Sequence, residues 1–206
     1  MHDPDFSGRF VVHLTAQISQ WFDAGKLAEE DLDRVLTPNA QAVIDAALDT
    51  IDWVPLADVE SFVEVLAEQL GHGAGLVEWA GRVAEEWASE ADIVAILARR
   101  DSLVDGAGFA VAELSDLLMR KSRWQFRGSR EYFSVSLPGL EDATSDLKAL
   151  LGALISRLAE SRNGCFDDLR FDGIDSGDFR IFGECCVSTQ TDASVESRLH
   201  RVALVG

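Results

Sequence analysis

The sequence predicts an α+β fold, in which a helical N-terminal half packs on a four- or five-stranded antiparallel sheet. Three observations support this prediction. Apolar residues recur at helical spacing through most of residues 5–120. Residues 122–137 and 165–188 instead alternate apolar and polar positions, which is typical of half-buried strands. An amphipathic stretch at 141–162 separates the two, so the expected order is strand-strand-helix-strand-strand.

The first expected helix carries an apolar side chain at every fourth position. These side chains are Phe6, Phe10, Leu14, Ile18 and Phe22. The spacing puts them on one face, which we expect to point into the core. A short helix is expected around residues 27–36. Thr37 and Pro38 then predict the start of a third helix, with threonine as the N-cap and proline at the first helical position.

Residues 52–55 interrupt the helical pattern, and Pro55 favours extended backbone before it. The following helix ends at Gly71. The apolar pattern then predicts one long helix from Leu76 to about Arg99. A last helix, from Phe109 to Met119, leads into the first hairpin.

We expect residues 1–188 to form a single domain, whose helical part spans 5–120 and whose sheet part spans 122–188. Residues 189–206 begin with a polar stretch that is typical of a linker or tail. The apolar positions between Leu199 and Val205 are compatible with a last strand, a docking segment or disorder.

The chain carries 36 acidic and 18 basic residues, for a formal net charge of -18. Such a chain repels phosphate backbones and anionic lipid, so we expect no nucleic-acid partner and no binding to anionic membranes. Five of the eighteen basic residues form a basic cluster: Arg120, Lys121, Arg123, Arg127 and Arg130. A solvated hairpin rim is the favoured interpretation. The alternative is a docking patch for an acidic ligand, or for an acidic surface on a partner or a second copy.

Nothing in the sequence suggests secretion or insertion into a membrane. The first residues lack the basic and apolar regions of a signal peptide. Apolar runs stay well short of the roughly 20 residues that a membrane helix needs. Three cysteines do not make a disulfide framework. We therefore expect a cytoplasmic protein without a membrane span.

Metal and catalytic motifs are not recognisable. Cys165, Cys185, Cys186 and His200 lack the spacing of zinc ligands, and the acids of the second hairpin lack that of a calcium loop. The sequence has no nucleophile elbow and no phosphate-binding loop. We expect His13 at the edge of the core and His72 in solvent. The prediction is a chain without catalytic residues, cofactor or bound metal, which is not an enzyme.

Several segments together resemble a known superfamily. They are FSGRFVVHLTAQISQWF at the start, Trp53-Val54-Pro55-Leu56, the RWQFRG and EYFSVSLPGL hairpin, the helix KALLGALISRLAESRNG, and the hairpin LRFDGIDSGDFRIFGECC. In element order and apolar pattern they are similar to the ligand-binding fold shared by haem-NO-binding (H-NOX) domains, 4-vinyl-reductase-type sensor domains and TRAPP-type trafficking subunits. Within that superfamily the chain is most like a group of stand-alone myxobacterial proteins of unknown function. The resemblance covers residues 6 to about 187.

The chain departs from this superfamily at its best-known ligand sites. H-NOX domains hold haem through a histidine near the end of the helical part, whereas residues 99–121 contain none. Their Tyr-x-Ser-x-Arg motif corresponds to Tyr132 through Ser136, with serine in place of arginine. Phe171 and Phe179 stand near the positions where the 4-vinyl-reductase-type sensors carry zinc-binding cysteines. The resemblance therefore implies binding of an apolar small molecule or a protein partner, without haem or zinc.

We accordingly expect a non-enzymatic sensor or adaptor domain. Its apolar ligand pocket would be lined by Trp87, Phe126, Phe133, Leu154 and Phe179. The alternative is that these side chains simply fill the core. A second hypothesis is a ligand-free interaction or scaffold module that forms a homodimer, with the basic cluster facing an acidic surface. An enzyme is the third and least favoured.

Overall fold

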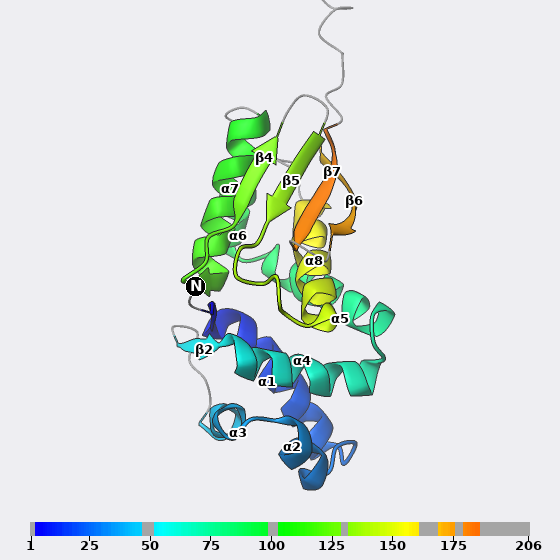
Figure 1. Cartoon of the computed structure of the whole chain (residues 1–206). Coiled ribbons are helices and arrows are strands. Elements are labelled where there is room, and N and C mark those ends of the chain that lie inside the picture. Colours follow the sequence, from blue (N-terminus) through cyan, green and yellow to red (C-terminus); the bar gives the residue numbers. More distant parts are fainter. Residues whose placement is uncertain are drawn as a thin grey trace, which may run out of the picture.

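The computed structural model describes residues 3–46, 52–98, 103–128, 132–160, 169–175 and 179–185 (Figure 1). Within these ranges the chain forms eight helices and seven strands, and the α+β class is confirmed. Arg130 and residues 189–206 lie outside the described residues.

Four helices form the part of the molecule drawn lowest in Figure 1. They are α1 (Gly8–Asp23), α2 (Glu29–Val35), α3 (Pro38–Asp45) and α4 (Leu56–Leu70). Helix α4 packs against the other three. Helix α3 begins as predicted, because the Thr37 side chain accepts a hydrogen bond from the backbone N–H of Ala40 at 3.0 Å.

A small antiparallel sheet, in the order β2-β1-β3, joins three distant segments of the chain and was not predicted. Its strands are β1 (Asp5–Ser7), β2 (Trp53–Pro55) and β3 (Met119–Arg120). The expected helix at Phe6 is therefore wrong in its first residues. Phe6 pairs with Val54 on one side and with Met119 on the other, and α1 begins only after its N-cap Ser7. Extended backbone before Pro55 is confirmed.

The long helix expected from Leu76 to Arg99 is two helices, α5 (Ala74–Trp87) and α6 (Ala91–Leu97). The chain leaves the first helix at Ser89, whose hydroxyl donates to the Glu86 carbonyl at 2.6 Å. Glu90 is extended, with φ -73° and ψ 136°, and precedes the second helix. Arg9 of α1 holds the new helix start, reaching Glu90 at 3.1 Å and Asp92 at 2.7 Å.

The second sheet is antiparallel in the order β4-β5-β7-β6. Its strands are β4 (Gln125–Gly128), β5 (Tyr132–Ser136), β6 (Leu169–Asp175) and β7 (Arg180–Cys185). Helix α8 (Ser145–Glu160) connects β5 to β6, while α7 (Leu103–Leu118) precedes β4. The alternation predicted for β5 is confirmed, since Phe133 and Val135 are buried whereas Tyr132 is 64% exposed.

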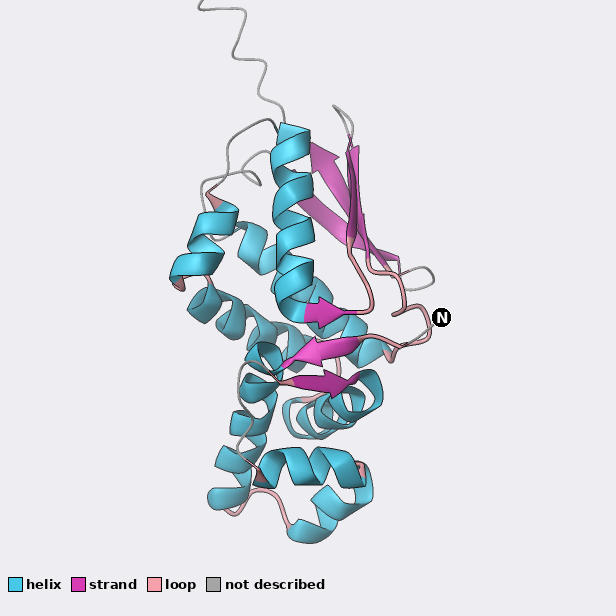
Figure 2. Cartoon of the chain, turned by 90° about the vertical axis from the view of Figure 1, so that its left-hand side faces the viewer, coloured by secondary structure: helices cyan, strands magenta, loops and turns pink. Residues whose placement is uncertain are grey.

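Helices α7 and α8 contact this sheet. Figure 2 shows the sheet beside α7. Helix α5 packs along α8 and so links the sheet to the lower helices. The buried apolar side chains of all these elements make one continuous cluster, which runs from Phe6 and Phe10 through Trp87 to Leu154 and Ile181. Within the described ranges, no helix is both long and apolar enough to cross a membrane.

Candidate functional site: an acid-rimmed hollow between α1, α2 and α3

The five side chains expected to line an apolar pocket all belong to the hydrophobic core or pack against it. Phe126 and Phe133 come together, with stacked rings whose centroids are 6.0 Å apart. Trp87 instead contacts α1, where its ring meets Phe10 edge to face at 6.2 Å. Leu154 and Phe179 are fully buried. A pocket among these five side chains stays a prediction.

Ion pairs hold much of the expected basic cluster. Arg120 and Lys121 reach the carboxylate of Asp5 at 2.5 Å and 2.9 Å, and Asp5 is nearly buried in β1. The Arg120 guanidinium also lies 5.1 Å from the centre of the Trp53 ring. Arg123 pairs with Asp116 at 3.5 Å. Three of the five cations thus have partners within the chain, so the cluster serves partly to join β1 to β3.

Arg127 is exposed on β4, and Arg130 falls outside the described residues.

Burial raises the pKa of Asp5, but the hydrogen bonds from Lys121 and Arg120 outweigh burial, and the net effect lowers the pKa below its usual value.

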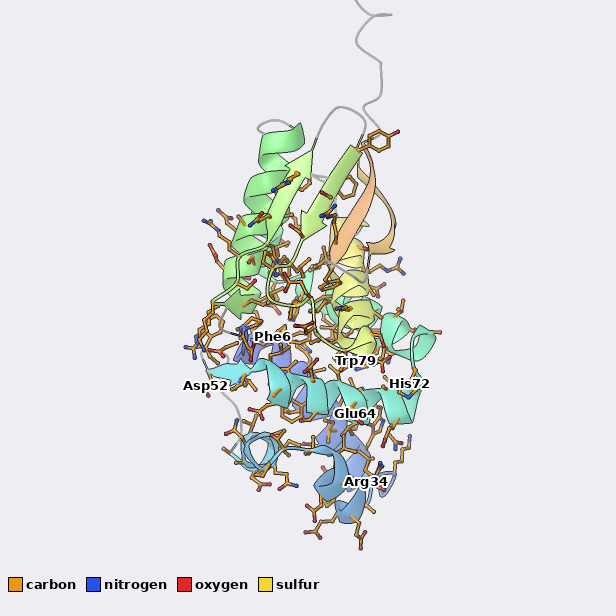
Figure 3. All side chains as sticks on the ribbon, in the orientation of Figure 1. Phe6, Arg34, Asp52, Glu64, His72 and Trp79 are labelled. Atoms are coloured by element: carbon orange, nitrogen blue, oxygen red, sulfur yellow. The ribbon has the colours of Figure 1, made fainter. Side chains whose placement is uncertain are left out.

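The two histidines differ from expectation in detail. His13 lies at the edge of the core, as predicted, and also accepts a hydrogen bond from the Trp87 indole. His72 is largely exposed, yet its Nδ1 lies 2.7 Å from a carboxylate oxygen of Asp146, in the first turn of α8. Figure 3 shows His72 at the far end of α4 from β2. In the part of the chain that the structure describes, no three His, Cys, Asp or Glu side chains gather closely enough to hold a metal ion.

A hollow of about 390 Å³ opens between the C-terminal half of α1 and helices α2 and α3. Its apolar lining comes from all three helices: Ile18, Phe22, Leu32, Leu36 and Ile44. Four exposed acidic residues also line the hollow, where it meets solvent: Asp23, Glu29, Asp33 and Asp45. We call these nine residues the acid-rimmed hollow.

The end of α1 sets the position of the hollow. Gly25 adopts φ 69°, which other residues reach only with strain, and the backbone N–H of Lys26 returns to the Trp21 carbonyl at 2.9 Å. This turn sends the chain back as α2. Leu27 is buried after the turn, while Phe22 before it keeps 45% of its surface exposed.

Polar contacts fix α3 on the opposite wall of the hollow. The buried carboxylate of Asp58, in the first turn of α4, accepts hydrogen bonds from the side chains of Thr37 and Asn39. Gln41 donates to the rim carboxylate of Asp33 at 3.0 Å. The nearby cation Arg34 points elsewhere, to both carboxylate oxygens of Glu68 at 3.2 Å and 2.9 Å. Figure 3 shows Arg34 at the α2 end of the molecule, below Glu64 of α4.

Sequence reasoning missed this hollow. The regular spacing of the α1 stripe predicted that Phe22 faces the core, and the 45% exposure of Phe22 shows that this prediction is wrong for the last turn of the helix. The available signal was the acid-rich segment that follows directly, from Glu29 to Asp33. Apolar side chains flanked by carboxylates can bind an apolar group that carries positive charge.

Comparison of the chain with protein-family models, with curated proteins and with solved structures found no match.

Proposed function

We propose that this protein is a non-catalytic interaction module of the sensor or adaptor kind. Its docking surface is the acid-rimmed hollow, and the partner is a protein segment whose apolar side chains are flanked by lysine or arginine. The observation that carries this proposal is the pairing of an exposed aromatic side chain, Phe22, with four carboxylates around one concave site.

The dimensions and charge of the hollow fit such a partner. About 390 Å³ lies within the range of small binding sites and accommodates a few apolar side chains. Exposed carboxylates at the rim attract cations over several ångströms and add specificity more than affinity. The net charge of -18 strengthens that attraction and disfavours anionic partners.

The resemblance to sensor and trafficking domains belongs to this proposal. Strands β4 and β5, helix α8 and strands β6 and β7 follow one another in the order that the resemblance implies, which supports it. Members of that superfamily act by binding ligands or partners, in agreement with a binding role for this chain. The sheet with its helices would then be the stable scaffold that carries the lower helices.

The test uses a fluorescently labelled 14-residue peptide made only of leucine and lysine, with leucines at i, i+3 and i+4 spacing. We expect fluorescence anisotropy to show binding to the wild type. Phe22→Ser should weaken binding by about tenfold or more, because burying a large apolar side chain contributes roughly 1.5–3 kcal/mol. The double variant Asp23→Asn/Asp45→Asn should weaken it less and reduce its salt dependence.

Matched controls separate the hollow from general acidity. Val77→Ser changes an apolar residue of α5 that is also 45% exposed, and Asp142→Asn removes an exposed acid away from the hollow. Both should bind the peptide like the wild type, and a peptide with glutamate in place of lysine should not bind. Equal binding by the wild type and Phe22→Ser would refute the proposed function.

A second candidate is an apolar small molecule held near the sheet, as the sequence suggests. The half-buried Phe126, stacked on Phe133, favours it. Native mass spectrometry of the protein purified from its own host tests it by the mass of any bound compound. A bound compound that Phe126→Ala no longer retains supports the candidate, and ligand-free wild-type protein rejects it.

A further inference from the structure

We propose that residues 195–205 of a second copy occupy the acid-rimmed hollow, so that the protein associates with itself through this segment. The inference rests on the proposed function and names one partner for the same site. It connects two parts of the chain that the fold otherwise leaves unrelated, the hollow between α1, α2 and α3 and a segment outside the described residues.

The sequence of this segment has the chemistry that the hollow requires. Val195, Leu199 and Val202 supply apolar side chains at spacings of four and three. Arg198 and Arg201 lie between and beside them, and residues 197–205 contain no acid. In a chain with twice as many acidic as basic residues, a stretch that combines these features stands out as a match for an apolar floor with a carboxylate rim.

The position of the hollow favours a second copy as the source of the segment. Strand β7 ends at Cys185, at the end of the molecule opposite α2 and α3 in Figure 1. Only nine residues separate Cys185 from Val195, so within one chain the segment is tethered to the end of the molecule that lies opposite the hollow. A neighbouring molecule can present the segment without this constraint. Two copies that exchange their segments reciprocally form a closed dimer.

Charge reversal at both sides tests the proposal in the full chain. We expect sedimentation velocity of the wild type to show a concentration-dependent dimer. Arg198→Glu/Arg201→Glu, and separately Asp23→Lys/Asp45→Lys, should each weaken dimerisation by about tenfold or more, because attractions become repulsions. The chain that carries all four changes should regain the dimer, because its charges are complementary again.

The control is Arg123→Glu/Arg127→Glu, which changes the net charge by the same amount in the basic cluster. It should dimerise like the wild type. If this control loses the dimer while Arg198→Glu/Arg201→Glu keeps it, the second copy binds through the basic cluster and the inference fails. A wild type that stays monomeric at high concentration also overturns the inference.

A separate readout distinguishes this inference from the proposed function. A labelled peptide of residues 193–206 should bind the Arg198→Glu/Arg201→Glu chain, whose hollow is free, and should lose affinity when Phe22→Ser is added. If the leucine-lysine peptide binds in a Phe22-dependent manner but the 193–206 peptide does not, the hollow binds partners and the self-association proposal is wrong. If neither peptide depends on Phe22, both proposals fail.

Discussion

The indole nitrogen of Trp87 donates a hydrogen bond to Nε2 of His13 at 2.9 Å, and the two rings meet edge to face. Trp87 is fully buried at the end of α5, so its N–H has no contact with water. Nε2 can accept this bond only while it carries no proton. This hydrogen bond between α1 and α5 therefore requires a neutral His13.

Acid should weaken the fold through this pair. Burial lowers the pKa of His13 below its usual 6.5, although Glu86 and Glu90 act in the opposite direction. Because the folded-state pKa is lower than the unfolded one, the unfolded chain binds more protons, and stability is lost as pH falls below about 6.5. We expect urea titrations to show a lower free energy of unfolding at about pH 5.5 than at about pH 7.5, before most carboxylates titrate. His13→Gln keeps an acceptor and does not titrate, so its free energy of unfolding should differ less between these two pH values. A variant that is as pH-dependent as the wild type would contradict the assignment.

Removal of the acceptor should be costly even at neutral pH. His13→Leu leaves the buried indole N–H of Trp87 without a partner, and we expect a loss of about 1–3 kcal/mol in the free energy of unfolding. His13→Gln should lose less, because its amide oxygen can accept the bond. Urea denaturation monitored by tryptophan fluorescence checks the order of the two variants. Equal losses would show that the hydrogen bond contributes little.

The carboxylate of Asp5 in β1 binds Arg120 of β3 and the next residue, Lys121, and so ties two strands of the small sheet together. Asp5→Ala removes the buried anion and leaves two exposed cations, and we expect a destabilisation of about 1–3 kcal/mol. Asp116→Ala is the matched control, because its pair with Arg123 is exposed on both sides and should contribute at most about 1 kcal/mol. Thermal unfolding of both variants gives the comparison, and a larger loss for Asp116→Ala would be inconsistent with the structure.

The lowered pKa of Asp5 also predicts how the free energy of unfolding changes in acid. The stabilisation is complete above the ordinary aspartate pKa of 3.8 and is lost as pH falls below it, through the folded-state value. The difference in stability between the wild type and Asp5→Asn should therefore shrink on acidification below about pH 4. Urea unfolding of both proteins at each pH measures this difference. A difference that stays constant from about pH 6 to about pH 3 would argue against an ionised Asp5.

Arg9 should be the residue that keeps α6 in place. Its guanidinium bridges Glu90 and Asp92 and lowers the pKa of Asp92, chiefly through their hydrogen bond. We expect Arg9→Met to speed hydrogen exchange of the α6 amides by about tenfold while α4 keeps its protection. Arg82→Met, at an exposed pair with Glu78 on α5, is the control and should leave α6 unchanged. Uniform acceleration in both α4 and α6 would point to global destabilisation instead.

Features that depend on neighbours in sequence could be predicted well. Thr37 and Pro38 marked the start of α3, because an N-cap needs only the next three residues. The alternation around Phe133 and Val135 indicated β5, because side chains on a strand point to opposite faces in turn. The prediction of one long helix from Leu76 was wrong, because the chain breaks at Ser89. Arg9, which lies on another helix, pairs with Glu90 directly after this break, and such a contact cannot be read from the local sequence.

The sequence by itself thus determined the α+β class, most helices and the two hairpin regions, because local periodicity and capping suffice for these. The tertiary structure alone decided that Asp5 meets residues more than a hundred positions away, and that α2 and α3 leave Phe22 at the wall of a hollow. The physical reason is that both depend on how helices and strands pack together. Phe10 and Phe22 belong to the same apolar stripe of α1, yet Phe10 is buried and Phe22 is exposed, so the local pattern alone cannot tell them apart.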